Sequence, residues 1–367
     1  MDRSLIGSGK FEINTPALLI DLEKMEFNLN AVADFLKDKE ANIRPHTKTH
    51  KSPVLAHKQI KAGAIGVTCQ KLAEAEVMAS AGIEDILITN QIIGSNKIKR
   101  LVNLAKKIDI KVVVDNVSNI EAISEAAMQE DVKLGVLVEV NIGLNRCGVT
   151  PGEEALQLAQ EIVKNKGLEF KGLMGYEGHT VFIESYEERK RETIKALKLL
   201  MDTKELVEQN GLKCKIISSG GTGTYNITGA YPGITEIEAG SYLTMDGQYG
   251  TIDGIGEKFK KALTLLTTVI SRPVEDRAVI DAGVKTVTED FGLPAVKDGE
   301  GITLFQLDEE NGHLRLENSG KNLKVGDKIE LIPSHGCTTI NLHDVFYGIR
   351  GGIVESILPI EARGKFG

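Results

Sequence analysis

The stretch Arg44-Pro45-His46-Thr47-Lys48-Thr49-His50-Lys51 begins where a short β-type run, Ile43-Arg44, ends, and a helical pattern starts beyond it near Ser52-Pro53. Two lysines, two histidines and an arginine would therefore gather at the end of a strand. A lysine in such a place is partly desolvated and close to other cations, and both effects lower its pKa. Such a lysine is suited to forming an imine with a carbonyl compound. A solvated basic loop is the alternative that charge content alone leaves open.

Strand-like and helix-like patterns alternate along the chain from residue 43 to residue 242. Amphipathic stretches such as residues 155–163, with apolar positions three and four apart, separate most of the strands. Eight strands joined by helices over about 200 residues predict an α/β fold, a (β/α)8 barrel of the TIM type. An open, doubly wound sheet is the alternative, because periodicity cannot show whether a sheet closes. The predicted strands are residues 43–49, 66–70, 85–90, 111–115, 134–141, 170–175, 215–218 and 236–241.

The pattern changes after residue 250, where short β-type runs are separated by turns such as Glu310-Asn311-Gly312 and helical patterns are absent. This change predicts a second, mostly antiparallel β-domain. We expect a barrel over residues 15–250 and a β-domain over residues 251–367, joined by residues 1–14. The segment 10–22, which includes Ala17-Leu18-Leu19-Ile20-Asp21, would pair into the β-domain. The predicted C-terminal strands are residues 262–270, 278–281, 301–307, 313–317 and 328–332.

Composition excludes several classes of function for this chain of 367 residues. The net charge is −8 and charges of both signs are interspersed, which argues against a nucleic-acid partner. The sequence contains no apolar run of about 18 residues, so no membrane span is expected. Its start, Met1-Asp2-Arg3-Ser4-Leu5, does not resemble a signal peptide. Four scattered cysteines predict a reduced, cytoplasmic protein without a disulfide framework.

Polar residues follow most of the predicted barrel strands, and barrel enzymes build their active sites at these carboxyl ends. Each of these residues taken alone is equally explained as a turn or a helix cap. The residues concerned are His46, Lys48 and His50 after the first strand, Gln70 after the second, residues 141–148 after the fifth, Tyr176-Glu177-Gly178-His179 after the sixth, residues 218–224 after the seventh, and Ser241-Tyr242 after the eighth.

The loop Ser218-Ser219-Gly220-Gly221-Thr222-Gly223-Thr224 combines three glycines with four hydroxyl residues. Glycine lets backbone N–H groups approach an anion, and hydroxyl groups add donors. Because loops after the last strands of a barrel often hold phosphate, the loop is a predicted phosphate site. A flexible loop is the alternative. The loop is neither a Walker motif nor a dinucleotide fingerprint.

His335 and Cys337 lie two residues apart after a β-type run of the second domain. On an extended chain the two side chains would project the same way. Imidazole and thiolate together suit Zn²⁺, and two protein ligands leave room for substrate and water. A buried cysteine beside an exposed histidine is the alternative.

Taken together, these motifs resemble the D-threonine aldolase and D-serine dehydratase family of fold-type III pyridoxal phosphate enzymes, which have an alanine-racemase-like barrel and a C-terminal β-domain. The resemblance covers nearly the whole chain. It begins at Asn14-Thr15-Pro16-Ala17 and includes the stretch 44–51. It continues through Cys147-Gly148-Val149, residues 175–179 and residues 219–224, and ends at residues 333–342.

The resemblance implies a role for each residue that matches the family pattern. Lys48 would hold pyridoxal 5'-phosphate as an imine, and Arg146 would face the pyridine nitrogen, to which guanidinium can only donate. Tyr176 and His179 would lie beside cofactor and substrate, and Gln70 would contact the cofactor. The phosphate would bind Gly220, Gly221, Thr222, Ser241 and Tyr242. His335 and Cys337 would bind a divalent metal, with Zn²⁺ favoured and Mn²⁺ or Mg²⁺ possible.

The implied function is a metal-assisted lyase acting on a small D-3-hydroxy amino acid such as D-serine or D-threonine, as a cytoplasmic homodimer. The family's dehydratases carry His-x-Cys at the metal site and its aldolases His-x-Asp, so Cys337 favours dehydration. Bacterial relatives with His-x-Cys are often labelled aldolases, which keeps D-threonine aldolase as the alternative. Lys48 would remove the α-proton in dehydration, and His179 the hydroxyl proton in retro-aldol cleavage. An amino-acid racemase and a non-catalytic pyridoxal phosphate binder are less favoured alternatives.

Overall fold

The computed structural model describes residues 3–367, which form two compact units. The first contains the described residues up to Ala31, then Thr49–Val54 and Ser241–Arg363. The second contains Val32–Lys48, Leu55–Gly240 and Gly364–Gly367. The domain limits 15–250 and 251–367 stay predictions, because compactness alone does not show where a domain folds by itself. Met1 and Asp2, which belong to the predicted joining segment and to the start judged unlike a signal peptide, lie outside the described residues.

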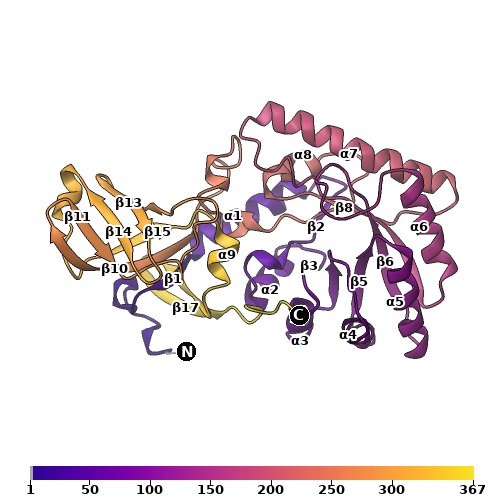
Figure 1. Cartoon of the computed structure of the whole chain (residues 1–367), viewed down its shortest axis with the longest axis horizontal. Helices are drawn as coiled ribbons and strands as arrows, with labels where there is room; N and C mark the ends of the chain where they lie inside the picture. Colours follow the sequence, from indigo (N-terminus) through magenta and orange to yellow (C-terminus); the bar gives the residue numbers. More distant parts are fainter. Residues whose placement is uncertain (1–2) are drawn as a thin grey trace. The chain divides into compact units, whose positions relative to one another are not determined.

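The second unit is built on an eight-stranded parallel sheet, counted over residues 3–367, with the order β2-β9-β8-β7-β6-β5-β4-β3 (Figure 1). Its two edges meet through a parallel bridge between His46 and Thr68, and the N–H of Thr68 donates to the carbonyl of Pro45 at 2.9 Å. The predicted (β/α)8 barrel is therefore confirmed, and the open sheet is wrong. The strands are β2 (Asn42–Ile43), β3 (Val67–Cys69), β4 (Asp85–Ile88), β5 (Asp109–Val114), β6 (Leu134–Glu139), β7 (Leu168–Met174), β8 (Ile216–Ser219) and β9 (Glu236–Ile237).

Helices cover the outside of this barrel (Figure 1). In α4 the buried side chains Ile98, Leu101 and Val102 recur three and four residues apart, which places them on one face. Helix α5 begins where the side chain of Asn116 accepts the N–H of Asn119 at 2.8 Å. Within residues 3–367, no helix is long and apolar enough to cross a membrane. Helix α1 (Leu22–Leu36) belongs mainly to the first unit. The helices that follow it are α2 (Pro53–Lys61), α3 (Leu72–Ser80), α4 (Ser95–Ala105), α5 (Val117–Gln129), α6 (Glu153–Lys164), α7 (Tyr186–Gln209) and α8 (Tyr225–Thr228).

The first barrel strand is much shorter than predicted. The expected run 43–49 is wrong beyond Ile43, because β2 ends there and Thr47–Thr49 forms the 3-10 helix η3. Pro45 has no N–H group to extend the ladder. Lys48 therefore stands in a tight turn directly after the strand, and the bridge at His46 is the last pairing before that turn.

The first unit contains a β-sheet in the order β13-β14-β11-β10-β1-β16-β17, with β15 paired to both β10 and β12. Strand β1 runs antiparallel to β10 and parallel to β16, which confirms that the N-terminal segment pairs with C-terminal strands. The first half of β10 pairs with β1 and β15, and its second half with β11. The strands are β1 (Ala17–Asp21), β10 (Leu263–Val274), β11 (Arg277–Ile280), β12 (Ala295–Val296), β13 (Ile302–Leu307), β14 (Gly312–Leu316), β15 (Lys328–Ile332), β16 (Val345–Arg350) and β17 (Ile353–Pro359).

Two features of this unit differ from the sequence prediction. The hairpin of β16 and β17 was not predicted, although Gly351-Gly352 at its turn, with φ of +54° and +83°, is a typical two-residue hairpin signal. The absence of helix after residue 250 is also wrong, because α9 (Gly336–Ile340) is helical. The 3-10 helices are η1 (Arg3–Leu5), η2 (Lys10–Glu12), η3 (Thr47–Thr49), η4 (Thr222–Thr224), η5 (Ser241–Leu243), η6 (Tyr249–Thr251) and η7 (Asn318–Asn322).

Arg44 does not join the cations that the sequence analysis placed around Lys48. The residue is 2% exposed, and Nε donates to both carboxylate oxygens of Glu236 at 3.0 Å. Nη1 donates to Oδ1 of Asp85 at 2.5 Å. Glu236 and Asp85 are the first residues of β9 and β4, so Arg44 ties strands together at the end of the barrel opposite the carboxyl ends. Its role is structural.

Replacing Arg44 with alanine should strongly destabilise the protein. The change leaves the carboxylate of Glu236, which is 2% exposed, without its partner. Breaking one half of a buried ion pair lowers the free energy of unfolding by about 3–5 kcal/mol, which urea denaturation can measure. Lys106→Ala, which removes an exposed ion pair with Glu130, is the control and should change stability little. Equal effects of the two substitutions would contradict the structural role of Arg44.

Candidate active site

Lys48 stands at the carboxyl ends of the barrel strands beside a histidine that is neutral. His46 is 5% exposed, and its Nε2 lies 3.2 Å from Oε1 of Gln70 and 3.4 Å from Oγ1 of Thr89. The backbone N–H of Lys48 points to Nδ1 of His46 at 3.5 Å. Burial, and then the Lys48 ammonium, hold the pKa of His46 well below its ordinary value. The expected gathering of cations is therefore wrong for both His46 and Arg44.

Glu238 is a titratable neighbour of Lys48 that the sequence analysis missed. It follows β9, where its carboxyl accepts the Ser218 hydroxyl at 2.7 Å. Burial raises the pKa of Glu238 to about 8, while Ser218 and the charge of Lys48 act in the opposite direction. The carboxyl is therefore mostly protonated at neutral pH. The sequence did contain a signal for this neighbour of Lys48, because Glu238 and Glu236 are two residues apart and share one face of a strand. The lowered pKa predicted for Lys48 itself stays a prediction.

His50 and Lys51 serve the local backbone of the first unit. His50 is fully buried, and its Nδ1 accepts the N–H of Ser52 at 3.1 Å. Lys51 has a φ of +53°, and its carbonyl accepts the N–H of Ala362 at 3.0 Å. The stretch 44–51 thus combines structural residues with the one lysine that stands after the strand.

Arg146, Tyr176 and His179 come together in the barrel unit, and their predicted places beside cofactor and substrate stay predictions. The exposed guanidinium of Arg146 lies 5.9 Å from the ring centroid of Tyr176. A Cβ added to Gly143 would lie 2.6 Å from Cε1 of His179, so the imidazole rests directly on that glycine. A Cβ added to Gly221 would lie 3.2 Å from the hydroxyl oxygen of Tyr176. An aromatic ring, an exposed imidazole and the glycine loop therefore border one region.

Two further titratable groups lie near Arg146. Burial raises the pKa of Glu139, the last residue of β6, although the side-chain amide of Gln91 donates to it at 2.5 Å. Burial, followed by the charge of Glu139, raises the pKa of the Cys147 thiol. Cys147 is therefore a protonated thiol and a poor nucleophile.

The glycine loop is buried, and most of its donors face inward. The Ser219 hydroxyl, the Gly220 N–H and the Thr224 hydroxyl donate to the carboxylate of Glu177 at 2.7, 3.0 and 2.7 Å. The N–H of Gly221 donates to Oγ1 of Thr224 at 3.1 Å. The hydroxyls of Ser219 and Thr224, which the sequence suggested as donors to an anion, are therefore bonded to Glu177. Phosphate binding by Gly220, Gly221 and Thr222 stays a prediction.

Ser241 and Tyr242, the other predicted phosphate residues, lie in η5 of the first unit. Oγ of Ser241 is 3.8 Å from Sγ of Cys337, so one predicted phosphate residue contacts one predicted metal ligand. Tyr242 is 1% exposed, and its ring centroid lies 6.1 Å from that of Phe259. The phosphate role of both residues stays a prediction.

His335 and Cys337 do not lie on one extended strand, so the geometric argument for the pair is wrong. His335 is extended, with φ −127°, and directly precedes α9, whereas Cys337 is inside that helix. The structure nevertheless brings the two side chains into contact. Burial alone would lower the pKa of His335, but interactions with Cys337 and then Asp290 outweigh it and raise the pKa to about 9.

The imidazole of His335 is held on two sides. Nδ1 lies 2.5 Å from Oδ2 of Asp290, and the ring stacks on Phe291 at 4.1 Å between centroids and 6° between planes. Asp290 also accepts the Thr338 hydroxyl at 3.0 Å. A carboxylate on Nδ1 leaves Nε2 to bind a cation, as in many metal sites. Within residues 3–367, no cluster of three or more His, Cys, Asp or Glu side chains is placed to hold a metal.

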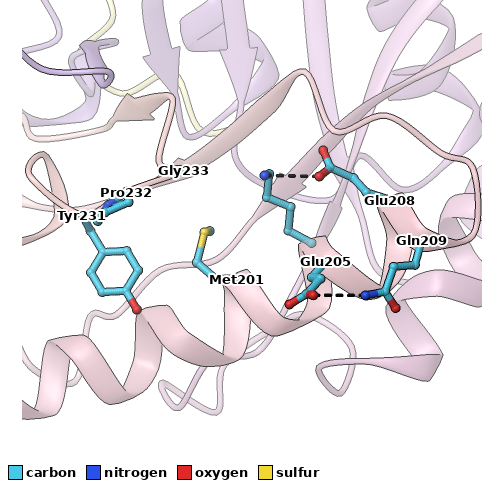
Figure 2. Close-up of a pocket in the computed structure, with 8 residues that line it drawn as sticks. Met201, Glu205, Glu208, Gln209, Tyr231, Pro232 and Gly233 are labelled. Atoms are coloured by element: carbon cyan, nitrogen blue, oxygen red, sulfur yellow. Dashed lines mark hydrogen bonds and ion pairs between the residues drawn. The ribbon is translucent and has the colours of Figure 1, made fainter.

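A separate hollow of about 870 Å³ lies between α7 and residues 231–233 (Figure 2). It is open to solvent, and its charged side chains pair along the helix, as in Lys204–Glu208 at 3.3 Å. Its lining contains none of the predicted site residues, and we assign it no function. The lining residues are Met201, Lys204, Glu205, Glu208, Gln209, Tyr231, Pro232 and Gly233.

Known protein families and relatives match this chain over nearly its whole length. Residues 20–248 match the family "Alanine racemase, N-terminal domain", and residues 262–349 match "Putative serine dehydratase domain". A D-threonine aldolase of Arthrobacter sp is 38% identical over 353 residues, covering 96% of this chain and 93% of the relative. A 3-hydroxy-D-aspartate aldolase of Paracoccus denitrificans (strain Pd 1222) is 37% identical over 370 residues, covering 99% and 95%. The crystal structure of D-threonine aldolase from Filomicrobium marinum matches with a TM-score of 0.94 at 38% identity, covering 98% of each chain.

A parallel barrel with a lysine in the turn after its first strand, followed by an antiparallel β-domain, defines the alanine-racemase-like class of pyridoxal phosphate enzymes. Within this class, the chain belongs to the D-threonine aldolase and D-serine dehydratase family of pyridoxal-phosphate-dependent lyases. The predicted resemblance, fold class and enzyme class are confirmed.

Lys48 should be the residue that bonds the cofactor covalently. The protein loaded with pyridoxal phosphate should be yellow. Borohydride reduction followed by peptide mapping should find the label on Lys48, because Lys48 is the half-buried lysine of the turn after β2. Lys48→Ala should lose both colour and label. The matched control is Lys51→Ala, which should keep the label on Lys48; a label on Lys51 of the unaltered protein would refute the assignment.

Proposed function

We propose that this lyase cleaves D-3-hydroxy-α-amino acids by a retro-aldol reaction, yielding glycine and an aldehyde. The main support is the full-length similarity, at 37% and 38% identity, to aldolases acting on D-threonine and 3-hydroxy-D-aspartate. Dehydration is the second candidate. Cys337 favours it, and a D-threo-3-hydroxyaspartate dehydratase of Delftia sp. (strain HT23) is 28% identical over 89% of this chain and 92% of the relative.

The residues at the barrel mouth fit pyridoxal phosphate. Lys48 would hold it, the ring of Tyr176 would flank it, and the glycines at 220 and 221 leave space that a Cβ would fill, at 3.2 Å from Ile237 and Tyr176. The guanidinium of Arg146 would donate to the ring nitrogen, because it cannot give up its proton. When bound, the cofactor supplies an electron sink for the bond that breaks at the α-carbon.

The proton transfers fall to two side chains of this chain. In aldol cleavage, the imidazole of His179 would take the proton from the 3-hydroxyl group. In dehydration, Nζ of Lys48 would take the proton from the α-carbon. His46, held neutral by burial, would orient the Lys48 turn through its hydrogen bonds to Gln70 and Thr89. One site holds the bases for both reactions, so the products must distinguish the two reactions.

A divalent cation also fits the donor set, with Nε2 of His335 and Sγ of Cys337 as its ligands. The contact between Nδ1 of His335 and Asp290 supports this, because it orients the opposite nitrogen away from the carboxylate. Imidazole with thiolate favours Zn²⁺, and Mn²⁺ or Mg²⁺ are the alternatives. Such an ion would act as a Lewis acid on the substrate's hydroxyl oxygen.

The products formed from D-threonine and D-serine test the proposed reaction. We expect glycine with acetaldehyde from D-threonine, and little oxo acid or ammonia from either substrate. L-threonine is the matched control and should not react. Oxo acid with ammonia as the main products would replace aldol cleavage by dehydration. Formation of L-allo-threonine from D-threonine, or of L-serine from D-serine, as the sole product would support the racemase alternative. A bound cofactor without any turnover would support the non-catalytic alternative.

Activity should depend on the proposed cation. EDTA should abolish turnover and leave the cofactor colour, and Zn²⁺ or Mn²⁺ should restore turnover. His335→Ala should lower metal content and activity by about tenfold or more, because one of two ligands is lost. Cys337→Asp should shift the preference toward harder cations.

The control for these substitutions is Cys214→Ala, which removes a barrel thiol whose pKa burial raises to about 12. This variant should keep the metal dependence of the unaltered protein. Full activity of Cys337→Ala in metal-free buffer would remove the cation from the mechanism.

We also propose that the enzyme is a cytoplasmic homodimer that acts on a small D-amino acid. The similarity to the aldolases supports the substrate class. The dimer rests on analogy with the family alone. Light scattering of the active protein tests it, and a fully active monomer would exclude it.

A further inference from the structure

Glu177 is a fully buried carboxylate whose role no motif indicated. Both of its oxygens accept two hydrogen bonds. Oε2 accepts the Ser219 hydroxyl at 2.7 Å and the Gly220 N–H at 3.0 Å. Oε1 accepts the hydroxyls of Thr224 and Thr228 at 2.7 and 2.5 Å. Four donors thus meet the two oxygens of this carboxyl group, each of which has lone pairs that accept hydrogen bonds.

The four donors all come from one continuous segment, residues 219–228. This segment is the end of β8, the glycine loop, η4 and the short helix α8. Thr224 extends the network, because its Oγ1 accepts the N–H of Gly221 at 3.1 Å. One carboxylate thus reaches the start, the middle and the end of the loop. Without these bonds, three glycines would leave the loop many conformations, and ordering it on binding would cost entropy.

Glu177 is itself held firmly in place. Its carbonyl accepts both the N–H and the hydroxyl of Thr180 at 2.9 Å. The Thr180 hydroxyl also lies 2.9 Å from that of Thr193 in α7. On the other side, a Cβ added to Gly223 would lie 2.0 Å from the carbonyl oxygen of Val181, so the loop packs directly on the segment that follows Glu177.

We propose that Glu177 is a positioning residue that holds the 219–224 loop in the shape that binds the phosphate group of the cofactor. The inference rests on the proposed function of this site. Because Tyr176 and His179 belong to the same short segment as Glu177, the carboxylate also keeps these two residues in register with the loop. The hydroxyls of Ser219 and Thr224 then act through Glu177 and not through direct contact with phosphate.

The test compares binding of pyridoxal phosphate and of pyridoxal, which lacks the phosphate, to the cofactor-free protein. Glu177→Ala should weaken pyridoxal phosphate binding by about tenfold or more, equivalent to about 1.4 kcal/mol. Pyridoxal binding should change little. Glu177→Gln keeps an acceptor and offers an amide to the hydroxyls, so it should retain most of the affinity. Glu187→Ala removes an exposed carboxyl of α7 and is the control.

Two milder variants keep the test decisive if Glu177→Ala does not fold. Ser219→Ala and Thr224→Val each remove one donor to the carboxylate, and both should weaken pyridoxal phosphate binding but not pyridoxal binding. Hydrogen exchange should become faster at the Gly220 and Gly221 amides in the same variants, without any ligand present.

The outcomes separate this inference from the proposed function. If the unaltered protein binds no pyridoxal phosphate, the proposed function fails. If it binds the cofactor, but the variants bind it equally well with unchanged exchange, Glu177 does not position the loop. Equal losses for pyridoxal and pyridoxal phosphate would make Glu177 a general structural residue and would also overturn the inference.

Discussion

Closure of the barrel at its first strand is the constraint on which the candidate site depends. Strand β2 has only two residues, yet it must pair with β9 on one side and lead to β3 on the other. Arg44 makes this possible by bonding the acids that begin β9 and β4. The chain can then turn sharply at Pro45, form the bridge at His46 and present Lys48 in a tight turn. A longer first strand would carry the lysine away from that position.

Buried and half-buried carboxyl groups meet three different environments in this barrel, and each environment decides what the group does. Glu236 faces a guanidinium and is a structural partner. Glu177 faces hydroxyls and an N–H, which orders a glycine-rich loop. Glu238 has one hydroxyl donor and a more distant ammonium, so burial dominates and raises its pKa to about 8. All three residues are glutamates, so their different roles come from the number and charge of their neighbours.

The hydrogen bonds of the glycine loop bear on the proposal that it binds phosphate. A loop rich in glycine and threonine suggests many direct contacts to an anion, yet several of its polar groups bond a carboxylate of the protein. The loop is thus ordered by the protein itself, and a bound phosphate group would not have to supply the entropy of ordering it. The β-unit shows a related arrangement, because Asp290 and Phe291 hold the imidazole of His335 on two sides.

The sequence by itself determined the alternation of strands and helices, the antiparallel C-terminal unit and the residues at the strand ends. These features follow from local periodicity and from the chemistry of single side chains. Lys48, Tyr176 and His179 could be named in this way. The tertiary structure alone decided the partners. Nothing in the sequence marks Glu177, which stands between Tyr176 and Gly178. Its four donors reach it only when β8 folds beside β7. Likewise, the contact of His335 with Cys337 arises from a helix that begins between them, and not from the two-residue spacing of an extended strand. Hydrogen bonds between residues far apart in sequence form only when the barrel has closed. Local sequence patterns therefore cannot predict them.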